Sequence, residues 1–152
     1  MRKPETQIAR LSDALVSQWL PNLRPEKFEG RSETWLGKAV GLNQFGVNHL
    51  QLEPGAWSSF RHWHEGEDEF AYILSGEVCL IDDNGEHLLK AGDFAGFPAG
   101  VANGHHLVNR SGQSATVLVV GTRLRGHETI HYPDGDFRPV EVVRDANGDR
   151  VT

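Results

Sequence analysis

Residues 62–76 read HWHEGEDEFAYILSG. His62 and His64 are two residues apart, so on an extended strand both side chains point to the same face, because strand side chains alternate. Glu69 follows a short polar turn and begins the apolar run 70–74, which is typical of a second strand. Two neutral imidazoles and one carboxylate that converge from neighbouring strands are suitable ligands for a divalent transition metal. The stretch therefore predicts a β protein with a candidate metal site.

The composition describes one ordinary domain. The chain has 152 residues, 38% of them hydrophobic and 24% charged, which is enough for a single core. No apolar run approaches the roughly 20 residues that span a bilayer, and no apolar segment follows the basic first residues, so we expect no secretory signal and no membrane partner. Cys79 is the single cysteine and cannot form an internal disulfide, which favours a cytoplasmic protein. The net charge of -6 argues against a nucleic-acid partner.

Short apolar runs alternate with turn signals from about Leu36 onward, in a chain that has 17 glycines and seven prolines in all. This spacing predicts an all-β sandwich or barrel. The expected strands are 47–52, 58–64, 69–74, 78–81, 87–89, 94–97, 106–109 and 115–122. Asn84-Gly85 suits a type I′ turn between two of them.

The two ends of the chain have a different character. Residues 1–35 form an N-terminal extension that is helical or irregular, with a weak helical pattern over residues 8–20. Residues 36–124 form the barrel, and residues 125–152 form a loop followed by a C-terminal hairpin that packs on it. One short helix is too little for a helix-turn-helix module.

A second polar motif lies further along, in residues 92–109. It contains Gly92, Pro98, Gly100, His105 and Asn109. Together with the first stretch and the preceding Gly55, it resembles the paired motifs of the cupin superfamily over about half of the chain. The chain has one residue more than the family pattern between Gly55 and His62, and two more between Gly100 and His105.

This resemblance implies a double-stranded β-helix, the jelly-roll or cupin barrel, with a metal inside. It implies His62, His64, Glu69 and a histidine of the second motif as ligands. Counting back from Asn109 selects His105 as the fourth ligand, and His106 is the alternative on the opposite face. Counting forward from Gly100 reaches Asn103, a poorer ligand for a transition metal.

Several other residues have ordinary structural interpretations. The turn 65–68 is expected to be solvated, Arg61 to face outward, and Cys79 to be a small buried apolar residue. His87 is expected to be exposed, His49 is a candidate to support the metal site, and at least one of the loop residues His127 and His131 should lie on the surface. The aromatic residues are expected to pack in the core or at a dimer interface rather than to stack on a ligand: Trp57, Phe60, Trp63, Phe70 and Tyr72.

A divalent metal with four protein ligands keeps about two open positions for a substrate. The ion could be iron, manganese, zinc, nickel or cobalt, since affinity order alone does not select one. The chain looks like the small single-domain bacterial cupins, which implies a metalloenzyme acting on a small, oxygen-rich substrate, by sugar-phosphate isomerase-like or by keto-acid or diketone chemistry. A metal-dependent dioxygenase and a non-enzymatic small-molecule-binding cupin are the alternatives. No catalytic residue is assigned, and we expect a homodimer.

Overall fold

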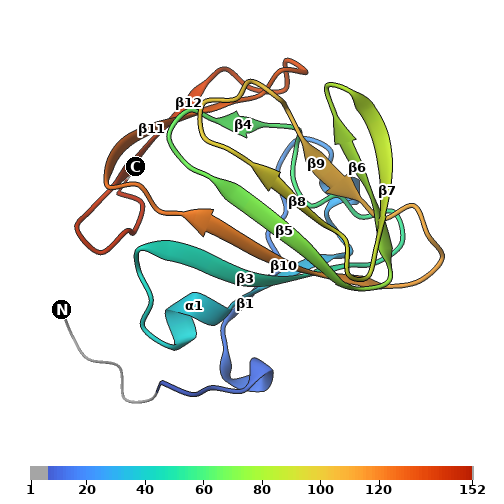
Figure 1. Ribbon diagram of the computed structural model, residues 1–152, viewed down its shortest axis with the longest axis horizontal. Coiled ribbons are helices and arrows are strands. Elements are labelled where there is room, and N and C mark those ends of the chain that lie inside the picture. Colours follow the sequence, from blue (N-terminus) through green and yellow to red (C-terminus); the bar gives the residue numbers. More distant parts are fainter. Residues whose placement is uncertain (1–6, 152) are drawn as a thin grey trace.

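The computed structural model describes residues 7–151 and is built almost entirely of antiparallel strands (Figure 1). The strands are β1 (Val16–Ser17), β2 (Arg31–Trp35), β3 (Phe45–Leu52), β4 (Trp63–His64), β5 (Glu69–Ser75), β6 (Glu77–Asp82), β7 (Gly85–Lys90), β8 (Phe94–Phe97), β9 (His106–Val108), β10 (Ala115–Thr122), β11 (Gly126–His131) and β12 (Val140–Arg144). The helical pieces are η1 (Leu11–Asp13), η2 (Pro25–Lys27) and α1 (Leu36–Ala39). The predicted all-β class is confirmed.

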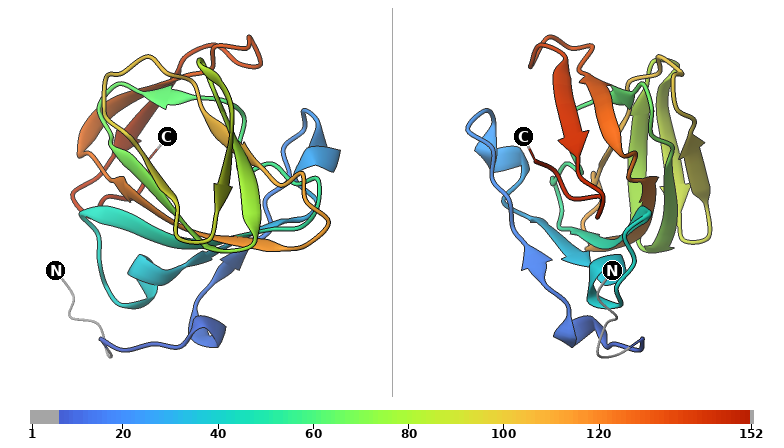
Figure 2. Two further views of the ribbon diagram at one scale, coloured as in Figure 1. Left: turned by 45° about the vertical axis from the view of Figure 1, so that its right-hand side comes forward. Right: turned by 90° about the vertical axis from the view of Figure 1, so that its left-hand side faces the viewer.

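Three sheets make the barrel. Their strand orders are β1-β2-β3-β10-β5-β8, β7-β6-β9 and β12-β11-β4. Seen along its axis, the strands follow one another round a closed ring (Figure 2, left). Closure leaves few free sheet edges, which suits a chain of many short strands.

The interior of the barrel has an apolar end and an open end. β3 and β10 pair with Leu52 opposite Ala115 and Leu50 opposite Val117, and all four side chains are buried. Ile73 on β5 completes this packing and is 0% exposed. Because side chains alternate along a strand, the same inward face continues towards the other end of β3 as Asn48 and Gly46, which line a cavity. The pairing register of β3 and β10 thus places the apolar core and the cavity on the same inward face of the sheet.

Gly76, the last residue of the first motif, connects β5 to β6 with φ of +73°. A Cβ atom there would lie 2.7 Å from the carbonyl oxygen of Ser114. Only glycine combines this left-handed backbone with such a close approach at low cost.

The N-terminal segment joins the barrel instead of standing apart. β2 pairs with β3 and carries β1 on its other edge, so the six-stranded sheet begins there. The weak helical pattern of residues 8–20 corresponds to the single turn η1 and to β1. In the described part of the chain, β1 and α1 lie below β3 in the view of Figure 1, outside the ring.

The prediction of a loop from residue 125 was wrong. β11 occupies residues 126–131 and pairs with both β12 and β4 (Figure 1). Its polar alternation, His127, Glu128, Thr129, lacks the apolar run that signals a strand, because its inward position 128 is a glutamate. After β12, the chain turns back and Arg144 forms an isolated bridge with Arg150, so the terminal hairpin is present.

Two local predictions need correction. Only Trp63–His64 is assigned as strand within residues 58–64, and His62 instead makes an isolated bridge with His105. The β6–β7 turn is centred on Asp83 and Asn84, because Asp82 pairs with Gly85. Neither central residue has a positive φ, so the turn is not type I′, and Gly85 takes the left-handed position at its end.

The aromatic residues divide between inside and outside. Phe60 is buried against Phe28, with ring centroids 5.0 Å apart, and Trp57 packs edge-on against both. Phe70 and Tyr72 point away from the barrel and are about one-third exposed. Within residues 7–151, no helix has the length and apolar character needed to cross a membrane.

Candidate metal centre

Three imidazoles converge on one carboxylate oxygen inside the barrel. The Oε1 atom of Glu69 lies 3.2 Å from His62 Nε2, 3.2 Å from His64 Nε2 and 2.8 Å from His105 Nε2. Glu69 begins β5 and His64 ends β4, while His62 directly precedes β4 and His105 directly precedes β9. The structure therefore brings together the four residues proposed from the two motifs.

The backbone explains why the two motifs meet. The amide of His62 donates to the carbonyl of His105 at 3.2 Å, and the amide of His105 donates back at 3.0 Å. This reciprocal pair is a single antiparallel bridge between segments far apart in the sequence. It fixes the two imidazoles side by side, with ring centroids 4.9 Å apart. Phe97 of β8 pairs with Glu69 of β5, and its ring stacks on the imidazole of His105, with ring centroids 3.6 Å apart.

Each imidazole is oriented by an acceptor at its other nitrogen. His62 Nδ1 donates to the carbonyl of Phe60 at 2.8 Å, and His105 Nδ1 donates to the carbonyl of Asn103 at 2.9 Å. His64 Nδ1 donates to Glu128 Oε2 at 2.9 Å. This network assigns the hydrogen to Nδ1 and leaves each Nε2 lone pair facing Glu69. Such outer contacts are typical of metal-binding histidines.

The donor set fits a divalent cation. Each of the three Nε2 atoms lies 2.8–3.2 Å from Glu69 Oε1, a separation expected between neighbouring ligands of one ion at metal–ligand distances of about 2.1 Å. Without a cation, these acceptor atoms would repel one another, so protons must take its place. Burial disfavours the charged form of His64, yet its hydrogen bonds to Glu128 and Glu69 prevail and raise its pKa to about 10. Burial opposes ionisation of Glu69, but His105, His62 and His64 hold the pKa of that carboxyl well below its usual range.

The alternatives for the fourth ligand lie elsewhere. His106 is buried, donates from Nδ1 to the carbonyl of Ser59 at 2.8 Å, and packs edge-on against Trp57. Burial lowers the pKa of His106, so it is a neutral side chain of the cavity wall. Asn103 donates from Nδ2 to Asp82 Oδ2 and accepts from the amide of Asp83, so its amide is engaged away from Glu69. The geometry favours His105.

Glu128 and Glu67 were missed as parts of this site. Glu128 is 4% exposed, and besides His64 it accepts from the amide of Gly66 at 3.2 Å. The prediction of a fully solvated turn at residues 65–68 was wrong for Glu67, which is 4% exposed and accepts from Arg144 Nε and from the amide of Leu124. The only sequence signal was the count of acidic residues near the motif. Their burial depends on β11 and on the hairpin beyond it.

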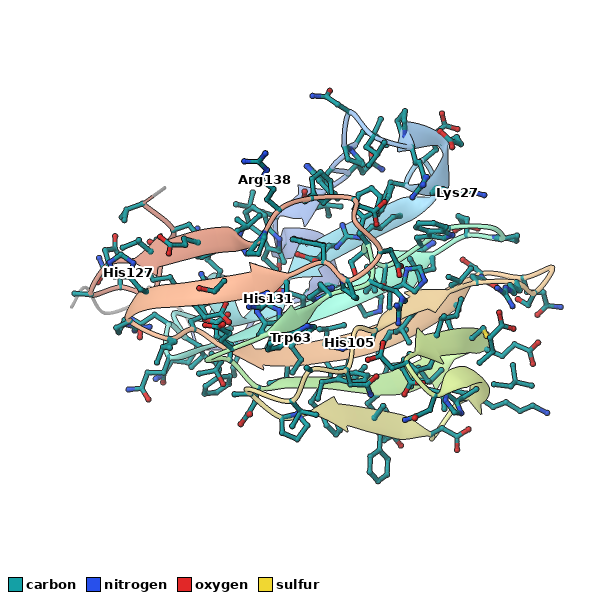
Figure 3. The ribbon with its side chains drawn as sticks, turned by 90° about the horizontal axis from the view of Figure 1, so that it is seen from above. Lys27, Trp63, His105, His127, His131 and Arg138 are labelled. Atoms are coloured by element: carbon teal, nitrogen blue, oxygen red, sulfur yellow. The ribbon has the colours of Figure 1, made fainter. Side chains whose placement is uncertain are left out.

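The remaining histidines lie outside the centre. His49 is on the outer face of β3, because its neighbours Asn48 and Leu50 line the cavity. His87 is exposed as predicted and pairs with Asp82 at 3.0 Å. His127 is exposed at the far end of β11 from His131, which stacks on Trp63 at 4.2 Å between centroids (Figure 3).

Arg61 and Cys79 also differ in detail from their predicted roles. Arg61 is not simply outward-facing: it donates to Asp83, to the carbonyl of Gly104 and twice to Asp134. It therefore fastens the loop after β11 to the barrel. Cys79 is half-buried on β6 rather than fully buried.

A cavity of about 630 Å³ opens beside the four candidate ligands. This volume falls in the range of small-molecule sites. Tyr132 lines it, with its ring 6.2 Å from the ring of His62. Burial raises the pKa of Tyr132, so its hydroxyl remains protonated and can donate a hydrogen bond. The fold and the site thus define a small β-barrel protein with a candidate metal centre in the wall of a cavity large enough for a small molecule.

Comparison with known proteins identifies the family. A family model described as the cupin domain matches residues 48–121. The chain is 45% identical to a sugar phosphate isomerase of the cupin superfamily from Silicibacter pomeroyi, with a TM-score of 0.79 over 93% of this chain and 91% of that one. No curated protein matches it. The chain belongs to the cupin superfamily.

Two further solved structures are similar. A protein named "Putative sugar phosphate isomerase" from Acidithiobacillus ferrooxidans is 34% identical, with a TM-score of 0.69 over 81% of this chain and 76% of that one. A protein named "predicted oxalate decarboxylase" from Thermotoga maritima is 26% identical, with a TM-score of 0.61 over 76% of this chain and 97% of that one.

Proposed function

We propose that this chain is a metal-dependent aldose–ketose isomerase that acts on a small sugar phosphate. The observation that carries the proposal is the convergence of three Nε2 lone pairs on Glu69 Oε1 at 2.8–3.2 Å. His62, His64, Glu69 and His105 would hold one divalent transition metal. Such an ion, when bound, acts as a Lewis acid that polarises a carbonyl oxygen. The names of the structures from Silicibacter pomeroyi and Acidithiobacillus ferrooxidans support the substrate class.

The protein's own side chains would position the substrate for proton transfer. An aldose–ketose isomerisation moves one proton between adjacent carbon atoms and one between their oxygens, so it consumes no co-reactant. Tyr132 lines the cavity beside His62 and would donate a hydrogen bond to a substrate oxygen. Glu128 would keep His64 in the tautomer that presents Nε2 to the cavity.

The test is turnover by metal-loaded protein. Protein produced without a histidine tag would be stripped with chelator and reconstituted separately with iron, manganese, zinc, nickel and cobalt. Incubation with aldose phosphates in D₂O should give the ketose phosphate, with deuterium at the carbon next to the carbonyl, as read by NMR. Metal-loaded protein that converts none of them would contradict the proposal. Oxygen uptake by the iron form with a keto acid or diketone would instead favour a dioxygenase, and recovery of a bound but unchanged ligand would favour a binding protein.

A further inference from the structure

The cavity carries a second group of charged side chains that the metal centre does not use. Lys38 of α1, Arg123 just after β10 and Arg150 beyond β12 all line it. Lys38 Nζ lies 3.9 Å from Asp149 Oδ1, and Arg123 Nη1 lies 4.0 Å from the same atom. Within residues 7–151, the side chains of Lys38, Arg123 and Arg150 make no hydrogen bond. The fold thus brings three cations to one cavity, and two of them lie within 4.0 Å of Asp149.

The other acidic groups of the cavity are already engaged. Glu33 accepts from Arg31 Nη2 at 2.7 Å, and Glu67 accepts from Arg144 Nε at 3.1 Å. Asp68 accepts from the amide of Ala99, and Glu69 belongs to the candidate metal centre. Outside the candidate metal centre, the charged side chains of the cavity that make no hydrogen bond within residues 7–151 are therefore three cations, Lys38, Arg123 and Arg150, and one carboxylate, Asp149.

The charged side chain of Arg123 is partly buried. Its side chain is 22% exposed. Burial and the nearby Arg144 lower its pKa, which means that the site disfavours the cation as it stands. A guanidinium has five donors in a planar fork, and a buried charge is stabilised only when it is paired. An anion with several oxygens would satisfy these donors.

We infer that Lys38, Arg123 and Arg150 form a subsite for the dianionic phosphate group of a phosphate monoester. A phosphate monoester carries a charge of about -1.5 to -2 near neutral pH, which suits a group of three cations with one carboxylate. Arginine forks bind phosphate oxygens in pairs, and lysine adds a point charge. Asp149 lies within 4.0 Å of both Lys38 and Arg123 and helps to place their charges.

The subsite and the candidate metal centre line one cavity. Between them, Glu67 contacts His64 of the centre and Arg144, whose charge acts on Arg123. The Oε2 atom of Glu67 holds Arg144, and its Oε1 atom lies 3.8 Å from His64 Nδ1. A ligand with a phosphate at one end and a carbonyl or hydroxyl at the other could therefore reach both. The assignment of the subsite to the phosphate of the substrate rests on the proposed isomerase function. The existence of an anion-binding site does not depend on that function.

The test is binding of inorganic phosphate to metal-free protein, measured by isothermal titration calorimetry after chelation. The wild type should bind phosphate saturably. Arg123→Gln and Arg150→Gln should each weaken binding by about tenfold or more, because charge-assisted hydrogen bonds are lost. Arg150 is exposed, so its substitution leaves the fold intact even if Arg123→Gln does not. Arg110→Gln is the matched control, since Arg110 is exposed, pairs with Glu86 and does not line the cavity.

Two outcomes would overturn the subsite: no saturable binding by the wild type, or equal affinity in the wild type, both cavity variants and the control. Ribose 5-phosphate and ribose then distinguish a monoester from free phosphate. The phosphorylated sugar should bind at least as tightly as inorganic phosphate and should depend on Arg123 and Arg150, whereas ribose binding should not. Phosphate binding that depends on these arginines without any turnover would contradict the isomerase and retain the subsite. Turnover of a sugar phosphate with unchanged KM in both variants would support the isomerase and contradict the subsite.

Discussion

At the scale of single residues, Glu69 supplies the one negative charge to which all three imidazole nitrogens of the candidate centre point. We expect Glu69→Gln to weaken metal uptake by more than about 100-fold, because it removes a ligand charge, whereas loss of a mere supporting contact costs about 10- to 100-fold. Metal content after equilibration with a competing chelator measures this. Glu141→Gln, at an exposed position of β12, is the control. Full occupancy in the Glu69 variant would contradict the ligand assignment.

A substitution of Glu128 tests whether the orientation of the His64 ring contributes to metal affinity. The Glu128 carboxylate accepts from His64 Nδ1 at 2.9 Å but does not face the other two imidazoles. Glu128→Gln should reduce metal affinity by about 10- to 100-fold without abolishing it, since the amide orients the ring less strongly. Competition titration with a fluorescent chelator resolves this intermediate loss. An affinity equal to that of wild type would show that the backbone alone orients His64.

At the scale of elements, Arg61 connects the segment before β4 to the loop between β11 and β12. Its hydrogen bonds to Asp134 hold the pKa of that carboxyl below its usual range. The folded-state pKa is therefore lower than the unfolded value of about 4, so the pair contributes stability above that pH and loses it as the pH falls below it. Thermal unfolding of Asp134→Asn should show a lower Tm than wild type at pH 7, and the difference should close towards pH 3. A difference independent of pH would show that the ion pair does not hold the loop.

At the scale of the whole molecule, a metal bound inside the barrel would stabilise the folded state alone. Ligands in β4, in β5 and beside β9 would be tied together, so chelator should lower Tm and added metal should restore it. Stabilisation follows the ratio of metal to Kd, amounting to about 2.7 kcal/mol at a hundredfold excess. Differential scanning calorimetry with and without chelator measures the shift, and the Glu69→Gln protein should show much less of it.

The homodimer stays a prediction, and the outer face of the large sheet is where it would form. Phe70, Tyr72 and Phe94 lie together there, and Phe94 is 64% exposed. Contiguous apolar surface of this kind favours association. Light scattering at micromolar concentration should give twice the chain mass, and Phe94→Asp should give a monomer. A wild-type monomer would rule the dimer out.

The sequence by itself determined those features of the fold and of the candidate site that depend on local periodicity. The spacing of His62 and His64 placed both side chains on one side, and the alternation from Glu69 onward defined β5 and its inward face. Strands 94–97 and 115–122 matched their predicted bounds, because turn residues and β-branched runs signal strand limits locally.

Only the tertiary structure decided which partners meet across the barrel. It set His105 rather than His106 against Glu69, because the bridge to His62 fixes which of the two adjacent side chains faces inward. It buried Glu67 and Glu128, and it brought Lys38, Arg123 and Arg150 to the wall of one cavity. A charged residue has no periodic signature that distinguishes a solvated face from a buried pair. Its role depends on segments distant in the sequence, and these come together only when the barrel closes.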